Sequence, residues 1–66
     1  MSDYISRLIE EKDQLMQRMA KLATFMAGEE FRNLYQHQQE LLQIQYHAMH
    51  TYNVCLTARI RQAKKE

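Results

Sequence analysis

The sequence predicts an all-α fold: an antiparallel helical hairpin, with a short first helix and a longer second helix, that assembles into a homo-oligomeric helical bundle. Three observations support this prediction. The chain of 66 residues has no proline and a single glycine, whereas a β-rich chain of this size needs several tight turns. Residue types that favour helices dominate the composition. Apolar residues recur at helical spacing in both halves of the chain.

The chain is predicted to form one domain over residues 1–66. The first helix is expected at about 3–26, the turn at about 27–29 and the second helix, without interruption, at about 30–63. Gly28 marks the turn, and we expect it to adopt the left-handed conformation that commonly follows a helix C-terminus.

The first helix carries one apolar stripe. Its members are spaced by three, four or seven positions and are Ile5, Leu8, Leu15, Met19, Leu22 and Met26. This spacing is typical of an amphipathic helix that packs through one face.

The second helix carries two neighbouring apolar rows that each repeat every seven residues. One row is Leu34, Leu41, Ala48 and Cys55, and the other is Leu42, Met49 and Leu56. One partner helix cannot cover both rows, so the pattern favours contacts with other chains. The predicted helix lengths also leave about 15 Å of the second helix beyond the first, and we expect this overhang to hold Leu56 and Ile60.

Composition limits the classes of function. The formal net charge of +1 is too small to draw the chain onto nucleic acid, and no DNA contact is expected. No apolar run reaches the length of a membrane span, and no targeting segment is visible, so no membrane partner is expected. The single cysteine excludes an intramolecular disulfide and suits a reducing compartment.

The residues needed for catalysis or metal binding are not found at suitable spacing. Cys55 lies in an apolar row, where we expect a buried, inert thiol. His47 and His50 are three positions apart, but neither has a glutamate three residues before it, as helical metal sites of this type require. We therefore predict no enzyme activity, no catalytic residue, no metal and no cofactor.

Four side chains beside the stripe of the first helix suit a small phosphorylated ligand that contains a base. Tyr4 and Arg7 lie near the start of this helix, and Lys21 and Thr24 lie near its end. An aromatic ring can stack on a base, and cations can bind phosphate. The same residues also fit ordinary roles, as a core aromatic, two solvated charges and a helix-end hydroxyl.

Spacing constrains any such site. Tyr4 and Lys21 are 17 positions apart, which is about 25 Å along one helix. Both can contact one compact ligand only if the first helices of two chains run antiparallel. A pocket that contains both residues must therefore form between subunits.

Two runs carry a family resemblance: KLATFMAGEEFRNL at 21–34 and QQELLQIQYHAMHTYNVCLTARI at 38–60. They contain, in order, Lys-Leu-x-x-Phe, Phe-x-x-Leu, Leu-Leu-x-x-Gln-x-x-x-Met-x-x-Tyr and a closing Leu-x-x-Arg-Ile. Together these motifs resemble the helical-hairpin domain of the phage anti-CBASS family that sponges cyclic oligonucleotides. The resemblance implies a homohexamer made by a phage in the cytoplasm of its bacterial host. It also implies binding of cyclic dinucleotides, and of cyclic trinucleotides at a separate site, without cleavage.

The resemblance also implies site residues. The family's dinucleotide pockets use a tyrosine on the N-terminal helix and a lysine and a threonine toward its end, which match Tyr4, Lys21 and Thr24. The trinucleotide site uses residues around the arginine of the closing Arg-Ile pair, which match Arg59 and Arg61. Small residues commonly follow this isoleucine in the family, and Arg61 departs from that pattern.

Two other classes of function also fit the sequence. The size and topology also fit a small homo-oligomeric helical-hairpin adaptor that binds RNA, although the weak net charge does not favour it. A purely structural oligomer or chaperone without a ligand is the third possibility.

Overall fold

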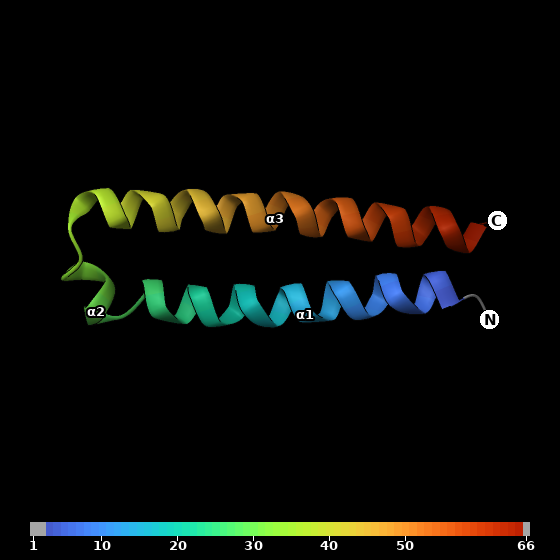
Figure 1. The fold of residues 1–66 in the computed structure, drawn as a ribbon, viewed down its shortest axis with the longest axis horizontal. Coiled ribbons are helices and arrows are strands. Elements are labelled where there is room, and N and C mark those ends of the chain that lie inside the picture. The colour runs from blue at the N-terminus through green and yellow to red at the C-terminus, as the bar shows by residue number, and fades with distance from the viewer. Residues whose placement is uncertain (1–2, 66) are drawn as a thin grey trace.

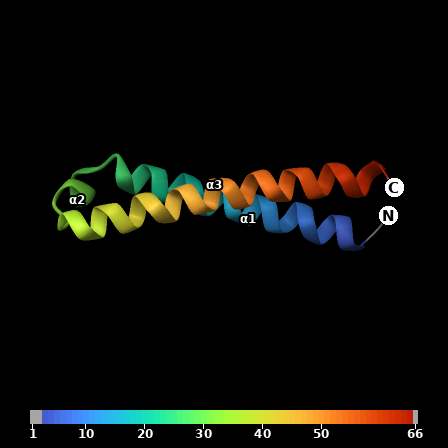
Figure 2. The ribbon, with the colours of Figure 1, turned by 90° about the horizontal axis from the view of Figure 1, so that it is seen from above.

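The computed structural model describes residues 3–65, and three α-helices occupy most of this range (Figure 1). They are α1 (Asp3–Met26), α2 (Glu29–Arg32) and α3 (Gln36–Lys65). The long helices α1 and α3 lie side by side and antiparallel in a rod of 48 × 15 × 13 Å, so the start of α1 and the end of α3 lie at the same end of the rod (Figures 1 and 2). No strand occurs in residues 3–65. The all-α prediction is therefore confirmed.

The hydrophobic core lies between α1 and α3. Leu8 and Leu15 of α1 are buried against Leu56 of α3. Partly buried side chains pack around them, namely Met19, Met49 and Ile60. The whole stripe predicted for the first helix is buried or half-buried, which confirms that this helix packs through one face.

The two apolar rows of α3 have different environments. Leu56 is buried and Leu42 and Met49 are half-buried, whereas Leu41 is 51% exposed and Cys55 is exposed. The expectation of a buried Cys55 thiol is therefore wrong for the single chain. The reason is the rotation of α3 about its axis. The row that contains Leu56 faces α1, and the neighbouring row is left uncovered.

The second helix is not continuous, contrary to the prediction for 30–63. Residues 33–35 interrupt it, so that α2 ends before α3 begins. The backbone N–H of Asn33 donates to the carbonyl oxygens of Glu29 and Glu30, at 3.1 and 3.2 Å, and closes α2. The Gln39 side-chain amide then donates to the carbonyl of Leu34 at 2.9 Å and stabilises the break.

Gly28 marks the turn but does not adopt the left-handed conformation that the sequence suggested. Its φ of −95° and ψ of 176° are extended, and it forms the N-cap of α2. Phe25 and Phe31 pack edge to face across this turn, with ring centroids 6.4 Å apart and an angle of 85° between the rings. Because α2 follows the turn directly, the chain needs an extended N-cap residue rather than a helix C-cap in the left-handed region.

The expected overhang at Leu56 and Ile60 is also absent. Leu56 exposes none of its surface, and Ile60 packs against the core cluster. α3 is six residues longer than α1, but the extra length lies at the turn end of the rod beside α2 (Figures 1 and 2). The extra residues of α3 therefore lie beside α2 at the turn end of the rod. The prediction had placed them at the opposite end, beyond α1.

The single hairpin leaves much apolar surface uncovered. Its accessible surface is 5343 Å², whereas a compact monomer of 8.0 kDa exposes roughly 4,450 Å². The larger exposed apolar side chains are Tyr4, Ile9, Met16, Phe25, Tyr35, Leu41, Ile44, Tyr52 and Val54. No helix within residues 3–65 is both long and apolar enough to cross a membrane.

Candidate ligand-binding site

A small hollow brings together three of the predicted site residues. It lies at the open end of the hairpin, where α1 begins and α3 ends. It measures about 200 Å³ and is lined by Tyr4, Arg7, Leu8, Glu11 and Arg59. The first four lie on one face of α1, because positions three and four apart on a helix are neighbours. α3 contributes Arg59 from the other side. Ligand pockets usually measure about 300–1,000 Å³, so this hollow can hold only part of a ligand.

Tyr4 and Arg59 are in direct contact. A guanidinium nitrogen of Arg59 donates a hydrogen bond of 3.0 Å to the Tyr4 hydroxyl, and the guanidinium carbon lies 5.9 Å from the ring centroid. This hydrogen bond raises the pKa of the Arg59 guanidinium above its usual value, so Arg59 is a permanent cation. Tyr4 still exposes 49% of its surface. The ring therefore keeps area on which a base can stack.

Arg7 is held more loosely. It forms an ion pair of 3.1 Å with Asp3, one turn earlier on α1, and both side chains are more than 70% exposed. An exposed pair of this kind contributes about 0.3–0.5 kcal/mol or less. A phosphate can therefore displace Asp3 from Arg7 at little cost.

Lys21 and Thr24 lie toward the turn end of α1, far from Tyr4. Because α1 is one continuous helix, the 17 positions between Tyr4 and Lys21 correspond to about 25 Å. Thr24 donates its hydroxyl to the Ala20 carbonyl oxygen at 3.0 Å. It also lines a hollow of about 360 Å³ at the turn, together with Phe25, Gly28, Glu29 and Glu30. One chain does not bring the four predicted dinucleotide residues together.

Arg59 and Arg61 do not share a hollow either. Residues two positions apart point to nearly opposite sides of a helix. Arg61 lines a separate hollow of about 210 Å³ on α3 with Asn53, Val54, Thr57 and Ala58. The buried Oδ1 of Asn53 has no hydrogen-bond partner within the described part of the chain. Arg59 and Arg61 thus line two separate hollows on one chain.

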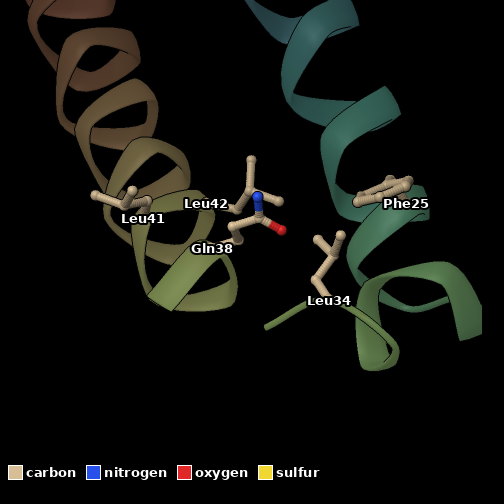
Figure 3. A pocket seen from close by; sticks show the side chains of 5 residues that line it. All are labelled: Phe25, Leu34, Gln38, Leu41 and Leu42. Carbon is tan, nitrogen blue, oxygen red and sulfur yellow. The ribbon is translucent and has the colours of Figure 1, made fainter. Parts of the chain in front are cut away.

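A fourth hollow, near the turn, is almost entirely apolar. It measures about 470 Å³ and is lined by Phe25, Leu34, Gln38, Leu41 and Leu42. In Figure 3, side chains from α1, from the 33–35 segment and from α3 border this hollow, and the Gln38 amide is the polar group among them. Its lining offers no cation for a phosphate, and its apolar character suits a contact between helices.

No group of three or more histidine, cysteine, aspartate or glutamate side chains within residues 3–65 is arranged to hold a metal ion. His47, His50 and Cys55 are all exposed on α3.

Sequence reasoning missed the pairing of Tyr4 with Arg59. The register of the hairpin, in which Leu8 lies beside Leu56, is the feature that would have revealed this pairing. Tyr4 lies one turn before Leu8 and Arg59 lies three positions after Leu56, so the two must meet across an antiparallel pair. Without knowledge of which row of α3 faces α1, this register could not be read from the sequence.

Comparison with known proteins gives the family. A model of the Sequestin family matches residues 2–62. The chain belongs to the Sequestin family. Sequestins are phage anti-CBASS sponges for cyclic nucleotides, and the family is one of binding proteins rather than enzymes, so the resemblance seen in the sequence is confirmed.

A second comparison links this Sequestin to a phage. The chain is 39% identical, over 61 residues, to a protein of Enterobacteria phage T4 described as an uncharacterized 7.5 kDa protein in the denB-rIIB intergenic region. The matched segment covers 92% of this Sequestin and 95% of the T4 protein. No solved structure matches the chain.

Proposed function

We propose that this protein binds cyclic dinucleotide second messengers in the cytoplasm of a phage-infected bacterium and holds them uncleaved, so that CBASS immunity is not activated. The observation that carries the proposal is the Sequestin match over residues 2–62. The open-end hollow supports it, because a half-exposed aromatic ring lies there beside Arg7, which is held only by an exposed ion pair. A ring and cations are the groups that stack on a base and bind phosphate.

The proposed dinucleotide pocket lies between two chains. Tyr4 and Arg7 come from the open end of one hairpin, and Lys21 and Thr24 come from the turn end of another. Two observations support this division: the length of α1 between Tyr4 and Lys21, and the small volume of the hollow around Tyr4. Neither set of residues can surround a ligand alone.

The proposed assembly is a homohexamer of hairpins. Support comes from the uncovered row of α3, where Leu41, Ile44, Ala48 and Cys55 follow one another at spacings of three, four and seven positions, as in a helix-packing seam. A single core in a chain of this length also rarely supplies more than about 3–5 kcal/mol, so contacts with other copies would add stability. Cyclic trinucleotides are proposed as ligands of a second site that includes Arg59 and Arg61.

Isothermal titration calorimetry of the purified protein tests the function. The titrants are a panel of cyclic dinucleotides, a cyclic trinucleotide and a short RNA duplex. The proposal expects saturable binding of at least one cyclic dinucleotide and no saturable binding of the duplex. Binding of the duplex alone favours the RNA adaptor, and binding of none of the titrants favours a purely structural oligomer.

A further inference from the structure

We infer that Arg59 is a positioning residue for the Tyr4 ring, and so serves the dinucleotide pocket as well as the trinucleotide site to which the family resemblance assigned it. This inference rests on the proposed function of Tyr4 as a stacking platform. It is carried by a contact between α1 and α3 that joins residues 55 positions apart.

The place of Tyr4 in α1 makes an anchor necessary. Tyr4 is the second residue of α1, in the first turn, where backbone N–H groups have no partners within the helix and the end tends to fray. Arg59 lies nearly two turns before the end of α3 and three residues after the fully buried Leu56. A residue in the interior of α3 thus holds a side chain of the first turn of α1.

The contact geometry leaves the stacking surface usable. The hydrogen bond is made at the hydroxyl edge of the ring, and the guanidinium carbon, 5.9 Å from the centroid, is near the outer limit of a cation–π contact. Tyr4 keeps 49% of its surface exposed while its hydroxyl is held. Arg59 therefore restrains the ring without covering it completely, as a prepositioned stacking platform requires.

The charges around Arg59 fit this role. Glu11 lines the same hollow and Arg7 is paired with Asp3, so Arg59 faces both an acid and a second arginine. Arg59 is a permanent cation and so keeps its donors available to the Tyr4 hydroxyl.

A double-mutant cycle tests the inference. The variants are Arg59→Gln, Tyr4→Ala and the double variant, each titrated with the tightest cyclic dinucleotide. Arg59→Gln should weaken binding by about two- to fivefold, the size of an exposed cation–π contact, and Arg59→Lys should restore part of the loss. In the Tyr4→Ala background, Arg59→Gln should change the affinity no further, because there is no ring left to position. The matched control is Lys64→Gln, which removes a cation from the last turn of α3 and should bind like wild type.

Two outcomes overturn the inference. An equal loss in both Tyr4 backgrounds would show that Arg59 contacts the ligand directly and does not act through Tyr4. An unchanged affinity in Arg59→Gln, with Tyr4→Ala impaired, would show that the ring needs no anchor.

A measurement without ligand separates this inference from the proposed function. In protein labelled on its tyrosine rings, the NMR signal of Tyr4 is assigned as the one lost in Tyr4→Phe. Arg59→Gln should shift this signal and leave the signals of the other three tyrosines in place. An unmoved Tyr4 signal contradicts the inference even if no cyclic dinucleotide binds, whereas a moved signal without binding contradicts only the proposed function.

Discussion

Leu8 of α1 and Leu56 of α3 are 48 positions apart in the sequence and pack together in the core between the two helices, where Leu56 exposes none of its surface. This contact fixes the register and the rotation of α3 against α1. The row of α3 that contains Leu56 stabilises the hairpin, and the uncovered row that contains Leu41 and Cys55 is left for other contacts.

Leu56→Ala should destabilise the hairpin itself. Replacing a fully buried leucine by alanine costs about 2–5 kcal/mol, a large fraction of the stability of so short a chain. Circular dichroism during heating should show a lower melting temperature at equal protein concentration. The control is Met16→Ala, because Met16 is 47% exposed in the hairpin and lies on α1 rather than on the uncovered row of α3. Equal melting temperatures for Leu56→Ala and wild type would contradict the core described here.

Ile44→Glu should dissociate the assembly but leave the hairpin helical. Ile44 is 63% exposed in the single chain and lies on the uncovered row, where a buried carboxylate would be costly in a subunit contact. Light scattering should report a lower mass, with an unchanged helical signal. Gln43→Glu adds the same charge next to this row and should keep the wild-type mass. A wild-type protein that is a folded monomer at micromolar concentration would end the proposal of a hexamer.

Gly28→Ala should be tolerated. The extended conformation of Gly28 is open to any residue, and a Cβ there would meet the Phe25 carbonyl oxygen at 3.4 Å, an ordinary contact. Removing the flexibility of glycine from the unfolded chain typically contributes about 0.4–1 kcal/mol. The melting temperature should stay the same or rise by a few degrees. A large fall would show that the turn needs glycine, as the left-handed conformation expected from the sequence would.

Tyr4→Ala and Lys21→Ala should each weaken binding of a cyclic dinucleotide without changing the oligomer. Base–aromatic stacking is worth about 1–3 kcal/mol, so Tyr4→Ala should cost roughly 5- to 150-fold in affinity. Loss of a charge-assisted contact at Lys21 should cost a similar amount. Calorimetry of the purified variants measures both effects, and wild-type affinity in both would show that these residues are not in the pocket.

Mixed assemblies of these two variants test the shared pocket. If each pocket takes its tyrosine from one chain and its lysine from another, mixed oligomers regain some complete pockets. Two purification tags, one on each variant, isolate the mixed species before titration. Partial recovery of tight sites is expected, and no recovery in a confirmed mixed oligomer would contradict a pocket built between chains.

Some features of the fold followed from local patterns and others did not. The stripe of α1 was predictable because its spacing depends on that helix alone. The break at 33–35 was not, since it contains neither glycine nor proline and is stabilised by the Gln39 side chain from the next helix. The exposure of Cys55 depended on how α3 is rotated, which two equally apolar rows left undecided.

The candidate site was also predictable only where it depends on one helix. Tyr4, Arg7, Lys21 and Thr24 could be chosen by residue type and family resemblance, and their separation along α1 followed from helical rise. The contact of Tyr4 with Arg59 required the register of two helices that are distant in sequence.

The central claim, that a cyclic nucleotide is held and not cleaved, is tested by recovering the ligand. The protein is mixed with a limiting amount of the cyclic dinucleotide that it binds most tightly, and the free ligand is separated by filtration. Heat then denatures the protein, and the released nucleotide is identified by chromatography and mass spectrometry. The account predicts depletion of free ligand before heating and full recovery of the intact cyclic dinucleotide afterwards, whereas linear dinucleotide or mononucleotides in the released fraction would contradict it.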